Sequence, residues 1–280
     1  MSQVWFITGA SRGLGQAITV AALAAGHSVV ATTRSGSFNI PDLVQTERLM
    51  VMPLDVTNPD ESAYQSIVEA AVAKFGRIDV LVNNAGYGLL SLFEETDEVQ
   101  LRAAFETNVF GLIRVTRAVL PVMRHQQSGH VFCISSMAGY VGGSAMYSAT
   151  KFAVSGFVES LAFELASFGI KATNVAPGYF RTDFLDTSSL HAQPAQKIAD
   201  YDTLRDYLNS FIQQSNHNQV GNPAALGQLL VEVAASQHPP IHLPVGADAI
   251  AAIEQRQNTL MADIDAWRNQ TTATTHEPVV

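Results

Sequence analysis

The stretch Thr8-Gly9-Ala10-Ser11-Arg12-Gly13-Leu14-Gly15 decides the fold of this chain. It joins a short apolar run, residues 4–7, to an amphipathic run, residues 14–25, that has a helical pattern. A tight strand-to-helix turn needs glycines where the backbone turns sharply and where it approaches a phosphate closely. The helix that follows presents unpaired N–H groups to that phosphate. The stretch therefore predicts a dinucleotide-binding turn, with an ordinary strand-to-helix turn as the alternative.

The rest of the chain continues this alternation of short apolar runs with longer amphipathic stretches. Such a rhythm is typical of βα units around a parallel sheet, and the nearly continuous apolar character of the runs predicts a sheet covered on both faces. Further strands are expected at 27–32, 49–54, 78–82, 130–134, 171–175 and 241–245, and further helices at 58–75, 97–123, 147–167, 201–211, from Asn222, and at 248–267. The 58–75 helix is expected to begin with Asn58 as its N-cap and Pro59 in its first turn.

Composition excludes several classes of protein. The chain has 280 residues, a formal charge of −9 and no cluster of Lys and Arg, which argues against nucleic acid as a partner. Its single cysteine, Cys133, lies in an apolar run and cannot form an internal disulfide, so we expect a small buried hydrophobic side chain there. There is no basic leader segment and no apolar run long enough to span a bilayer, so we expect a cytoplasmic protein that does not bind membranes.

A series of further motifs follows the glycine turn in a fixed order. They are Asp55-Val56, Asn83-Asn84-Ala85-Gly86, Asn108, Ser135-Ser136, Tyr147-x-x-x-Lys151, and Pro177-Gly178 with Thr182. With the Gly-x-x-x-Gly-x-Gly spacing of the turn, the series resembles the short-chain dehydrogenase/reductase family over residues 3–182. The resemblance implies an α/β fold, a Rossmann-type doubly wound parallel sheet in three layers (α/β/α). We expect one oxidoreductase domain over residues 1–270, a substrate lid at about 180–219, and a disordered tail at 271–280.

The end of the second expected strand bears on the choice of cofactor. It reads Ala31-Thr32-Thr33-Arg34, where an NAD enzyme usually has an Asp or Glu that binds the ribose hydroxyls. A guanidinium can instead hold a 2′-phosphate with two hydrogen bonds, and Arg12 could reach the same phosphate from the other side. The sequence therefore predicts NADP(H), the alternative being that both arginines are solvated surface residues.

The resemblance assigns a set of cofactor residues. Asp55 would contact the adenine, Asn83 the adenosine ribose region and Thr182 the nicotinamide end. The whole expected set is Gly9, Ser11, Arg12, Gly13, Leu14, Gly15, Arg34, Asp55, Val56, Asn83, Ala85, Gly86, Tyr147, Lys151, Pro177, Gly178 and Thr182.

Tyr147 and Lys151 lie four residues apart, hence on one face of a helix. A phenol is a poor proton shuttle at neutral pH unless a positive charge stabilises the phenolate, so we expect the ammonium, together with the oxidised nicotinamide, to lower the pKa of Tyr147. By resemblance, Tyr147 is the general acid and base, and Lys151 also holds the nicotinamide ribose. The alternative is that Tyr147 only anchors helix packing.

Two more catalytic residues follow from the resemblance, Ser136 to orient the substrate oxygen and Asn108 to support a water and Lys151. Ser135 competes for the first role, and Ser136 is chosen because Met-Ala-Gly139 follows it. Tyr147 comes 11 residues after Ser136, a shorter spacing than the family leads us to expect, so the shape of the loop at 140–146 is open.

Other reactive groups favour simpler interpretations. His238 and His242 are separated by two prolines and have no carboxylate or cysteine cluster beside them, so no metal site is expected. Ser136 lacks the Gly-x-Ser-x-Gly setting of a hydrolytic nucleophile. The acids Glu94, Glu95, Asp97 and Glu98 are interpreted as a solvated helix start.

Large apolar side chains in the 180–219 region, with Tyr87, Leu89 and Leu90, suggest an apolar or aromatic carbonyl substrate, although they could simply pack the lid. The Thr-Arg strand end and the Gly246-Ala-Asp248 region look similar to the hydroxysteroid and retinol-type reductase branch. The function expected is an NADP(H)-dependent carbonyl reductase. The alternative is a non-catalytic NADP(H) sensor. By resemblance, the helices at 97–123 and 147–167 would form a homodimer or homotetramer.

Overall fold

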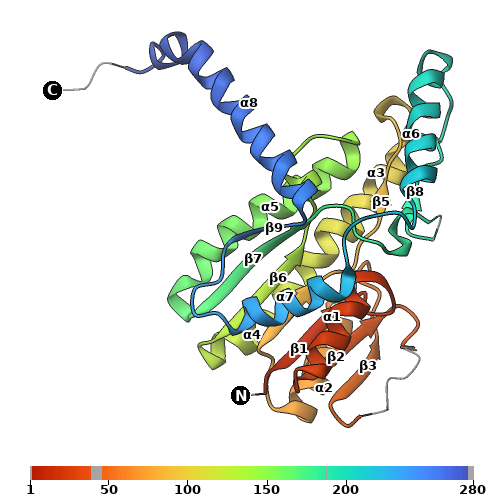
Figure 1. Ribbon diagram of the computed structural model, residues 1–280. Helices are drawn as coiled ribbons and strands as arrows, with labels where there is room; N and C mark the ends of the chain where they lie inside the picture. The colour runs from red at the N-terminus through yellow and green to blue at the C-terminus, as the bar shows by residue number, and fades with distance from the viewer. Residues whose placement is uncertain (1, 39–45, 187, 277–280) are drawn as a thin grey trace.

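Seven parallel strands form one sheet in the computed structural model, which describes residues 2–38, 46–186 and 188–276 (Figure 1). Their order across the sheet is β3-β2-β1-β4-β6-β7-β9. The strands are β1 (Val4–Thr8), β2 (Ser28–Thr33), β3 (Leu49–Pro53), β4 (Val80–Asn83), β6 (Gly129–Ile134), β7 (Ile170–Pro177) and β9 (His242–Val245). The order reverses between β1 and β4, and such a switch point opens a crevice at the carboxyl ends of the strands.

Helices cover both faces of this sheet. Two lie on one face, α1 (Gly13–Ala24) and α7 (Pro223–Ala235), and three on the other, α2 (Glu61–Phe75), α4 (Leu112–Gln126) and α5 (Ala145–Leu165). Side chains alternate along a strand, so Trp5 and Ile7 pack toward α1 and α7, whereas Phe6 packs toward the other three helices. All three are at most 1% exposed. This confirms the predicted single Rossmann-type domain of three layers.

The starts of two helices test the capping predictions. Asn222 caps α7 as predicted, since its side chain accepts a hydrogen bond from the Ala224 N–H at 2.9 Å. For α2 the predicted start was wrong: the helix begins at Glu61, and Asp60 is its N-cap, accepting from Ser62 N–H at 2.9 Å. Asn58 instead accepts from Asp60 N–H at 3.0 Å, in a turn that precedes the helix.

The helical region predicted at 97–123 is divided into three parts. These are α3 (Glu98–Phe105), the π-helical turn η2 (Glu106–Gly111) and α4. Gly111 packs so closely that a Cβ there would lie 2.7 Å from the Val56 carbonyl oxygen. Wider turns of this kind interrupt helices where close packing or a functional side chain requires it, and η2 holds Asn108.

The chain between β7 and α7, which we call the β7–α7 segment (residues 178–222), leaves the sheet. It contains η5 (Asp183–Leu185), β8 (Leu190–His191), η6 (Ala199–Tyr201) and α6 (Asp202–Ser215). Strand β8 pairs in parallel with β5 (Gly88–Leu89), and the two form a small separate sheet. Neither strand was predicted, because a strand of two residues is too short to show a pattern of alternating apolar side chains.

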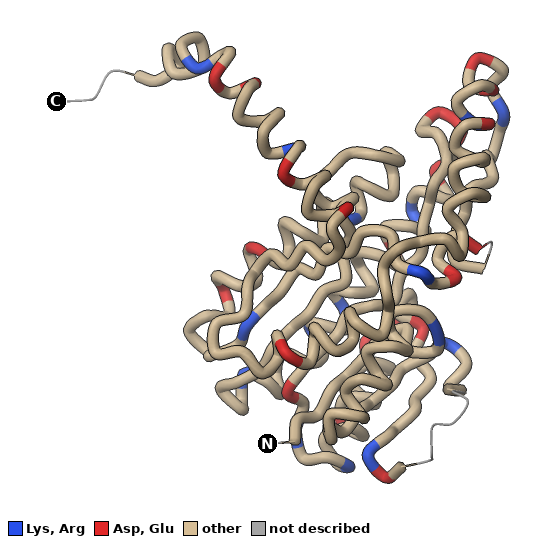
Figure 2. The backbone as a smooth tube through the Cα atoms, viewed as in Figure 1, with Lys and Arg blue, Asp and Glu red and all other residues tan. Residues whose placement is uncertain are grey.

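Two helices project from the body at the end of the sheet where the crevice lies, α6 and α8 (Ala247–Thr272) (Figure 1). The last helix is longer than the predicted 248–267. It includes residues 271–272, which were assigned to the disordered tail, and residues 277–280 of that tail lie outside the described residues. None of the helices in the described parts of the chain is long and apolar enough to cross a membrane. Figure 2 shows acidic and basic residues scattered along the tube.

Candidate active site

A cavity of about 700 Å³ opens where the carboxyl ends of the central strands meet. Most of the predicted site residues line it: Gly9, Ser11, Arg12, Gly13, Leu14, Arg34, Asp55, Val56, Ala85, Gly86, Ser136, Tyr147, Lys151, Pro177, Gly178 and Thr182. Three predicted residues, Gly15, Asn83 and Asn108, are not among the lining residues. The cavity thus brings together residues that lie more than 130 positions apart in the sequence.

The glycine turn is shaped by close packing. Gly9 and Gly13 have φ angles of +64° and +58°, which favour glycine. A Cβ at Gly15 would lie 2.4 Å from the Gly9 carbonyl oxygen and from Asn84 Nδ2. Gly15 therefore lets the turn close and is not among the lining residues, and its predicted contact with the cofactor stays a prediction.

Thr8 and Asn84 join the glycine turn to the loop after β4. Thr8 Oγ1 accepts hydrogen bonds from the backbone N–H groups of Asn84 and Ala85, both at 3.0 Å. Asn84 Nδ2 donates to the carbonyl oxygens of Thr8 (2.9 Å) and Gly9 (3.0 Å). The carboxyl ends of β1 and β4, on which the switch point depends, are thereby held together.

Asn83, the residue chosen from the sequence, points the other way. It is 2% exposed, and its Nδ2 donates to Thr116 Oγ1 at 2.8 Å, on α4. Asn83 is the last residue of β4, and alternation places its side chain on the same side as Leu81, toward α4. The predicted contact of Asn83 with the cofactor is therefore not supported. Counting the alternation from Leu81 would have pointed to Asn84, which does line the cavity.

The groups expected at the adenosine end lie together at one side of the cavity. Asp55 accepts hydrogen bonds from Thr57 N–H (2.9 Å) and Thr57 Oγ1 (2.7 Å). These bonds, and to a smaller extent the charge of Arg34, hold the pKa of Asp55 below its ordinary value. Arg34 follows directly after β2 and contributes its cation to the same wall.

Arg12 contacts Ser188, a partner that was not predicted. Its guanidinium donates to the hydroxyl and to the carbonyl oxygen of Ser188, both at 2.7 Å. Arg12 thus ties the glycine turn to the β7–α7 segment instead of converging with Arg34. This contact could not be predicted from local patterns, because Arg12 and Ser188 are 176 residues apart in the sequence.

Tyr147 and Lys151 lie on α5 and are both buried. Lys151 Nζ lies 5.7 Å from the centre of the Tyr147 ring and donates to the Ile134 carbonyl oxygen at 3.0 Å. Burial lowers the pKa of Lys151 to about 8. Burial also raises the pKa of Tyr147, and a hydrogen bond with the Ser136 side chain only partly opposes this. Desolvation therefore dominates the pKa of Tyr147 in the protein alone, and the predicted lowering by the ammonium together with an oxidised nicotinamide stays a prediction.

The two adjacent serines have different surroundings. Ser136 precedes η3 (Met137–Gly139), accepts from Ala138 N–H at 3.1 Å and hydrogen-bonds the Tyr147 side chain. Ser135 is 4% exposed, and its hydroxyl donates to the Lys151 carbonyl oxygen at 3.1 Å. The geometry therefore favours Ser136 over Ser135 as the partner of the phenol.

Asn108 is not among the lining residues but supports the cavity wall through hydrogen bonds to Tyr87. Its Oδ1 accepts from Tyr87 N–H and its Nδ2 donates to the Tyr87 carbonyl oxygen, both at 3.0 Å. Nδ2 also lies 3.3 Å from Thr150 Oγ1, on α5. The carboxamide thus clamps the backbone of Tyr87, which lines the cavity, and its predicted role in supporting a water and Lys151 stays a prediction.

The part of the cavity wall formed by the loops after β4 and β6 and by the β7–α7 segment is mainly apolar and aromatic. It includes Tyr87, Leu90, Met137, Val141, Tyr179, Phe180, Phe184 and Leu185. The Phe184 ring lies 5.9 Å from that of Tyr147, and the His191 ring 5.0 Å from that of Tyr87. Leu89, which was grouped with these residues, is fully buried and is not among the lining residues. Tyr179 and His191 were missed in the sequence.

A buried ion pair between Glu95 and Arg205 fixes α6 to the body of the domain. Glu95, in η1 (Phe93–Glu95), is 1% exposed and accepts from Arg205 Nε at 2.9 Å and from Ile198 N–H at 2.9 Å. The interaction with Arg205 holds the pKa of Glu95 below its ordinary value. The interpretation of Glu95 as a solvated acid was therefore wrong, because its partner lies 110 residues away.

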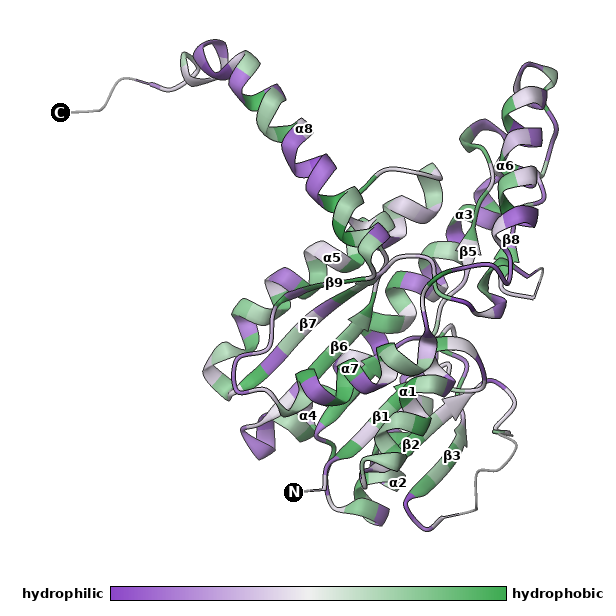
Figure 3. Cartoon of the chain, in the orientation of Figure 1, coloured by the Kyte–Doolittle hydropathy of each residue, from purple (hydrophilic) through white to green (hydrophobic). Residues whose placement is uncertain are grey.

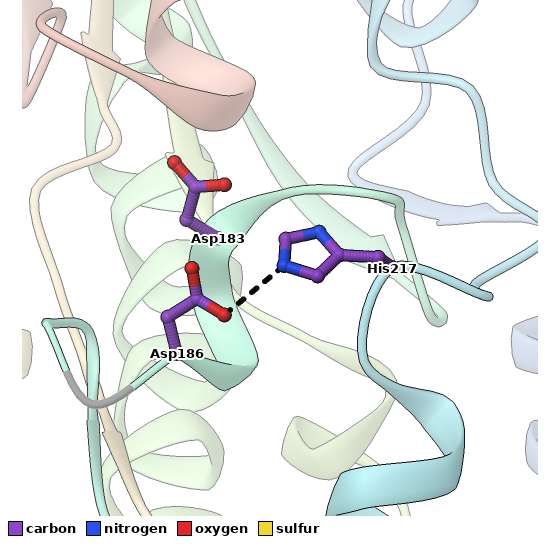
Figure 4. Close-up of side chains that lie close together, drawn as sticks. All are labelled: Asp183, Asp186 and His217. Carbon is purple, nitrogen blue, oxygen red and sulfur yellow. Dashed lines mark ion pairs between the residues drawn. The ribbon is translucent and has the colours of Figure 1, made fainter.

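Within the described residues, one group of possible metal ligands lies close together: Asp183, Asp186 and His217 (Figure 4). His217 Nε2 lies 3.3 Å from Asp186 Oδ1, and Asp183 and His217 are exposed. The ion pair alone accounts for this approach. His242, the other histidine of interest, hydrogen-bonds the Tyr140 hydroxyl through Nδ1 at 2.6 Å.

Comparison with known proteins agrees with this arrangement. A model of the short chain dehydrogenase family matches residues 3–193. The chain is 38% identical over 272 residues to "Oxidoreductase BOA17" of Botryotinia fuckeliana, covering 96% of this chain and 97% of that protein. A crystal structure of a short-chain dehydrogenase from Streptomyces avermitilis matches with a TM-score of 0.85 and 35% identity, covering 99% of this chain and all of that one. The protein ElxO, solved with NADP bound, matches with a TM-score of 0.69 and 27% identity, covering 90% of this chain and all of that one. The chain belongs to the short-chain dehydrogenase family of oxidoreductases.

Proposed function

We propose that this protein is an NADP(H)-dependent oxidoreductase that interconverts a carbonyl compound and its secondary alcohol. The observation that carries the proposal is the meeting of Ser136, Tyr147 and Lys151 in the cavity that the glycine turn borders. Its reacting groups fit proton transfer to a substrate oxygen, and its turn fits a dinucleotide. A bound nicotinamide would supply the hydride for reduction or accept it in oxidation.

The chain fits the cofactor at two places. The first is the glycine turn, where Gly9 and Gly13 line the cavity without side chains and α1 begins with unpaired N–H groups for a pyrophosphate. The second is the wall that carries Asp55 and Arg34, suited to the adenosine half. The end of β2 holds a cation and no acid, which favours a 2′-phosphate and hence NADP(H) over NAD(H).

The catalytic roles follow from the hydrogen bonds. The raised pKa of Tyr147 keeps its phenol protonated, as a proton donor to a carbonyl oxygen must be. Ser136, in contact with the phenol, donates a second hydrogen bond to the same oxygen. Lys151 places a positive charge beside the tyrosine as the phenolate forms. Asn108 acts as a positioning residue, through the backbone of Tyr87.

The substrate we propose is an apolar or aromatic carbonyl compound. The wall formed by Tyr87, Tyr179 and Phe184 offers apolar surface near Tyr147, and the β7–α7 segment would close over it as the substrate lid. Pockets of this kind bind mainly through apolar area, with a few polar groups fixing orientation. A panel of hydrophobic ketones and charged sugars tests this, and turnover of the sugars alone would overturn it.

Two further features of the proposal concern setting and assembly. The faces of α4 and α5 would join copies into a homodimer or homotetramer, and the exposed Phe110, Phe152 and Phe163 on this helical layer support that contact. Cys133 is a buried free thiol, and we place the reaction in the cytoplasm.

The test of the proposed function is the Tyr147→Phe variant, assayed with NADPH and the ketone panel. We expect turnover to fall by about 10²–10⁴-fold, the usual contribution of a general acid, while calorimetry gives an unchanged NADPH affinity. Unchanged turnover would refute the assigned mechanism. If the wild type binds NADPH but reduces no carbonyl compound, the protein is a nucleotide sensor on this scaffold and the proposal fails.

A further inference from the structure

Helix α8 is fixed to the body only at its beginning. Ala249 and Ile253 are buried there, and Asp248 accepts a hydrogen bond from Tyr179 N–H at 2.7 Å. Every residue from 254 to 272 is exposed, and Figure 1 shows this part of the helix standing free of the domain. Most helical stability in proteins comes from packing of an apolar face, so a long helix without such packing is marginal in water.

The exposed part of α8 carries an apolar stripe. Leu260, Met261, Ile264 and Trp267 are 44%, 51%, 41% and 62% exposed. Leu260, Ile264 and Trp267 follow one another at spacings of four and three, and the same alternation leads back to the buried Ile253. Spacings of three and four place side chains along one side of a helix, as in the seam of a coiled coil. Figure 3 shows hydrophobic and hydrophilic residues alternating along α8.

Charged side chains flank this stripe in a self-complementary order. Glu254 and Arg256 precede its centre, and Asp263 and Arg268 follow it. In an antiparallel pair of α8 helices related by a two-fold axis beside Leu260, Glu254 of each copy lies within two residues of the level of Arg268 of the other, and Arg256 within one residue of the level of Asp263, offsets of about 3 Å or less along the axis. In a parallel pair the flanking positions that meet lie five residues apart, so Asp263 would meet Arg268, but Arg256 would meet Met261 and Glu254 would meet Ala249, leaving two of the four charges without an opposite partner.

We propose that the exposed stripe of α8 binds the same stripe of a second copy of this chain, antiparallel, with Leu260 at the two-fold axis. The contact is separate from the one proposed for α4 and α5. The charges of α8 disfavour an anionic lipid surface as the occupant, because the helix has four acids (Asp248, Glu254, Asp263 and Asp265) and two bases (Arg256 and Arg268).

Site-specific disulfide formation in the full chain tests the arrangement. Leu260→Cys places the new thiol at the axis, opposite its copy, whereas the thiols of Trp267→Cys would be separated by about 20 Å along the antiparallel pair, beyond the reach of a disulfide. Ala262→Cys, two residues from the axis but on the opposite side of the helix, is the matched control. The native Cys133 is buried, which keeps background crosslinking low.

We expect Leu260→Cys to give a disulfide-linked dimer on non-reducing gels under mild oxidation, well above the yield of both other variants. Equal crosslinking of Leu260→Cys and Trp267→Cys would indicate a parallel pair and overturn the proposal. A yield from Leu260→Cys no higher than that from Ala262→Cys would overturn it as well, since the stripe would then face something other than a second copy. NADPH binding by each variant serves as the check that the domain is folded.

Discussion

The two sides of the cavity are built in different ways. On the cofactor side, the glycine turn and the loop after β4 are held by backbone geometry and by hydrogen bonds among Thr8, Gly9, Asn84 and Ala85, at the ends of two adjacent strands. On the substrate side, the β7–α7 segment lies off the sheet. Its long-range contacts include the β5–β8 pairing, the Arg12–Ser188 hydrogen bonds and the buried Glu95–Arg205 ion pair.

This difference separates what the domain requires from what the substrate requires. The cofactor side cannot change without disturbing the packing of β1, β4 and α1. The substrate side rests on a few side-chain contacts, and α6 has no buried residue of its own. Segments with few buried contacts open at low free-energy cost. We therefore expect changes on the cofactor side to affect both folding and cofactor binding, and changes on the substrate side to affect the substrate KM.

The largest effect is expected from Gly15→Ala, on the cofactor side. The added methyl group would lie 2.4 Å from the Gly9 carbonyl oxygen, so the turn must shift. We expect NADPH binding to be lost and the free energy of unfolding to fall by about 1–3 kcal/mol, as for other overpacked sites. Calorimetry and urea unfolding measure the two. Gly156→Ala, in the interior of α5 with open space around its Cβ position, is the control: it should leave NADPH binding unchanged and raise the free energy of unfolding by up to about 1 kcal/mol, because Ala favours the helix more than Gly does. Normal NADPH affinity in Gly15→Ala would contradict the account.

On the substrate side, Glu95→Gln removes the charge that holds Arg205. We expect the substrate KM to rise about tenfold with little change in kcat, because the β7–α7 segment loses its anchor while the reacting groups stay in place. The NADPH dissociation constant should stay the same. Glu98→Gln, at an exposed helix pair, is the matched control. A fall in kcat with unchanged KM would show that the ion pair serves the chemistry and not the lid.

The pH dependence of reduction tests Lys151, which lies between the two sides. Burial lowers its pKa to about 8, so its charge is present below pH 8 and is lost as the pH rises through that value. We expect kcat to fall above pH 8, since an uncharged amine no longer stabilises the phenolate of Tyr147. In Lys151→Arg the guanidinium stays charged, and the fall should move to higher pH. A rate that rises through pH 8 in the wild type would oppose this role.

The smallest effect is expected at the contact that links the two sides. Ser188→Ala removes one of the two acceptors of Arg12 and leaves the carbonyl oxygen. If Arg12 exchanges Ser188 for a 2′-phosphate, the variant should bind NADPH more tightly, by about fivefold, since one hydrogen bond is worth about 1 kcal/mol. NADH affinity should be unchanged. An equal gain for both nucleotides would remove Arg12 from the specificity argument.

The same comparison explains what the sequence could predict. The sheet, its order of βα units and the glycine-rich turn between the first strand and helix follow from local patterns, and these predictions are confirmed by the fold. Asn83 was misassigned by one residue because the end of β4 was not counted through its alternation. Glu95, Ser188 and the strand pair β5–β8 could not be predicted, because each depends on a partner about 100 residues or more away. The raised pKa of Tyr147 depends on burial, which the helix pattern alone did not reveal.

The most direct test of the central claim is a side-by-side calorimetric titration of the protein with NADPH and with NADH. We expect clearly tighter binding of NADPH, because Arg34 directly follows the second strand, at the place where an acid would select NADH. Equal or tighter binding of NADH would contradict the proposed cofactor preference. Failure to bind either nucleotide would contradict the assignment of the cavity as a dinucleotide site.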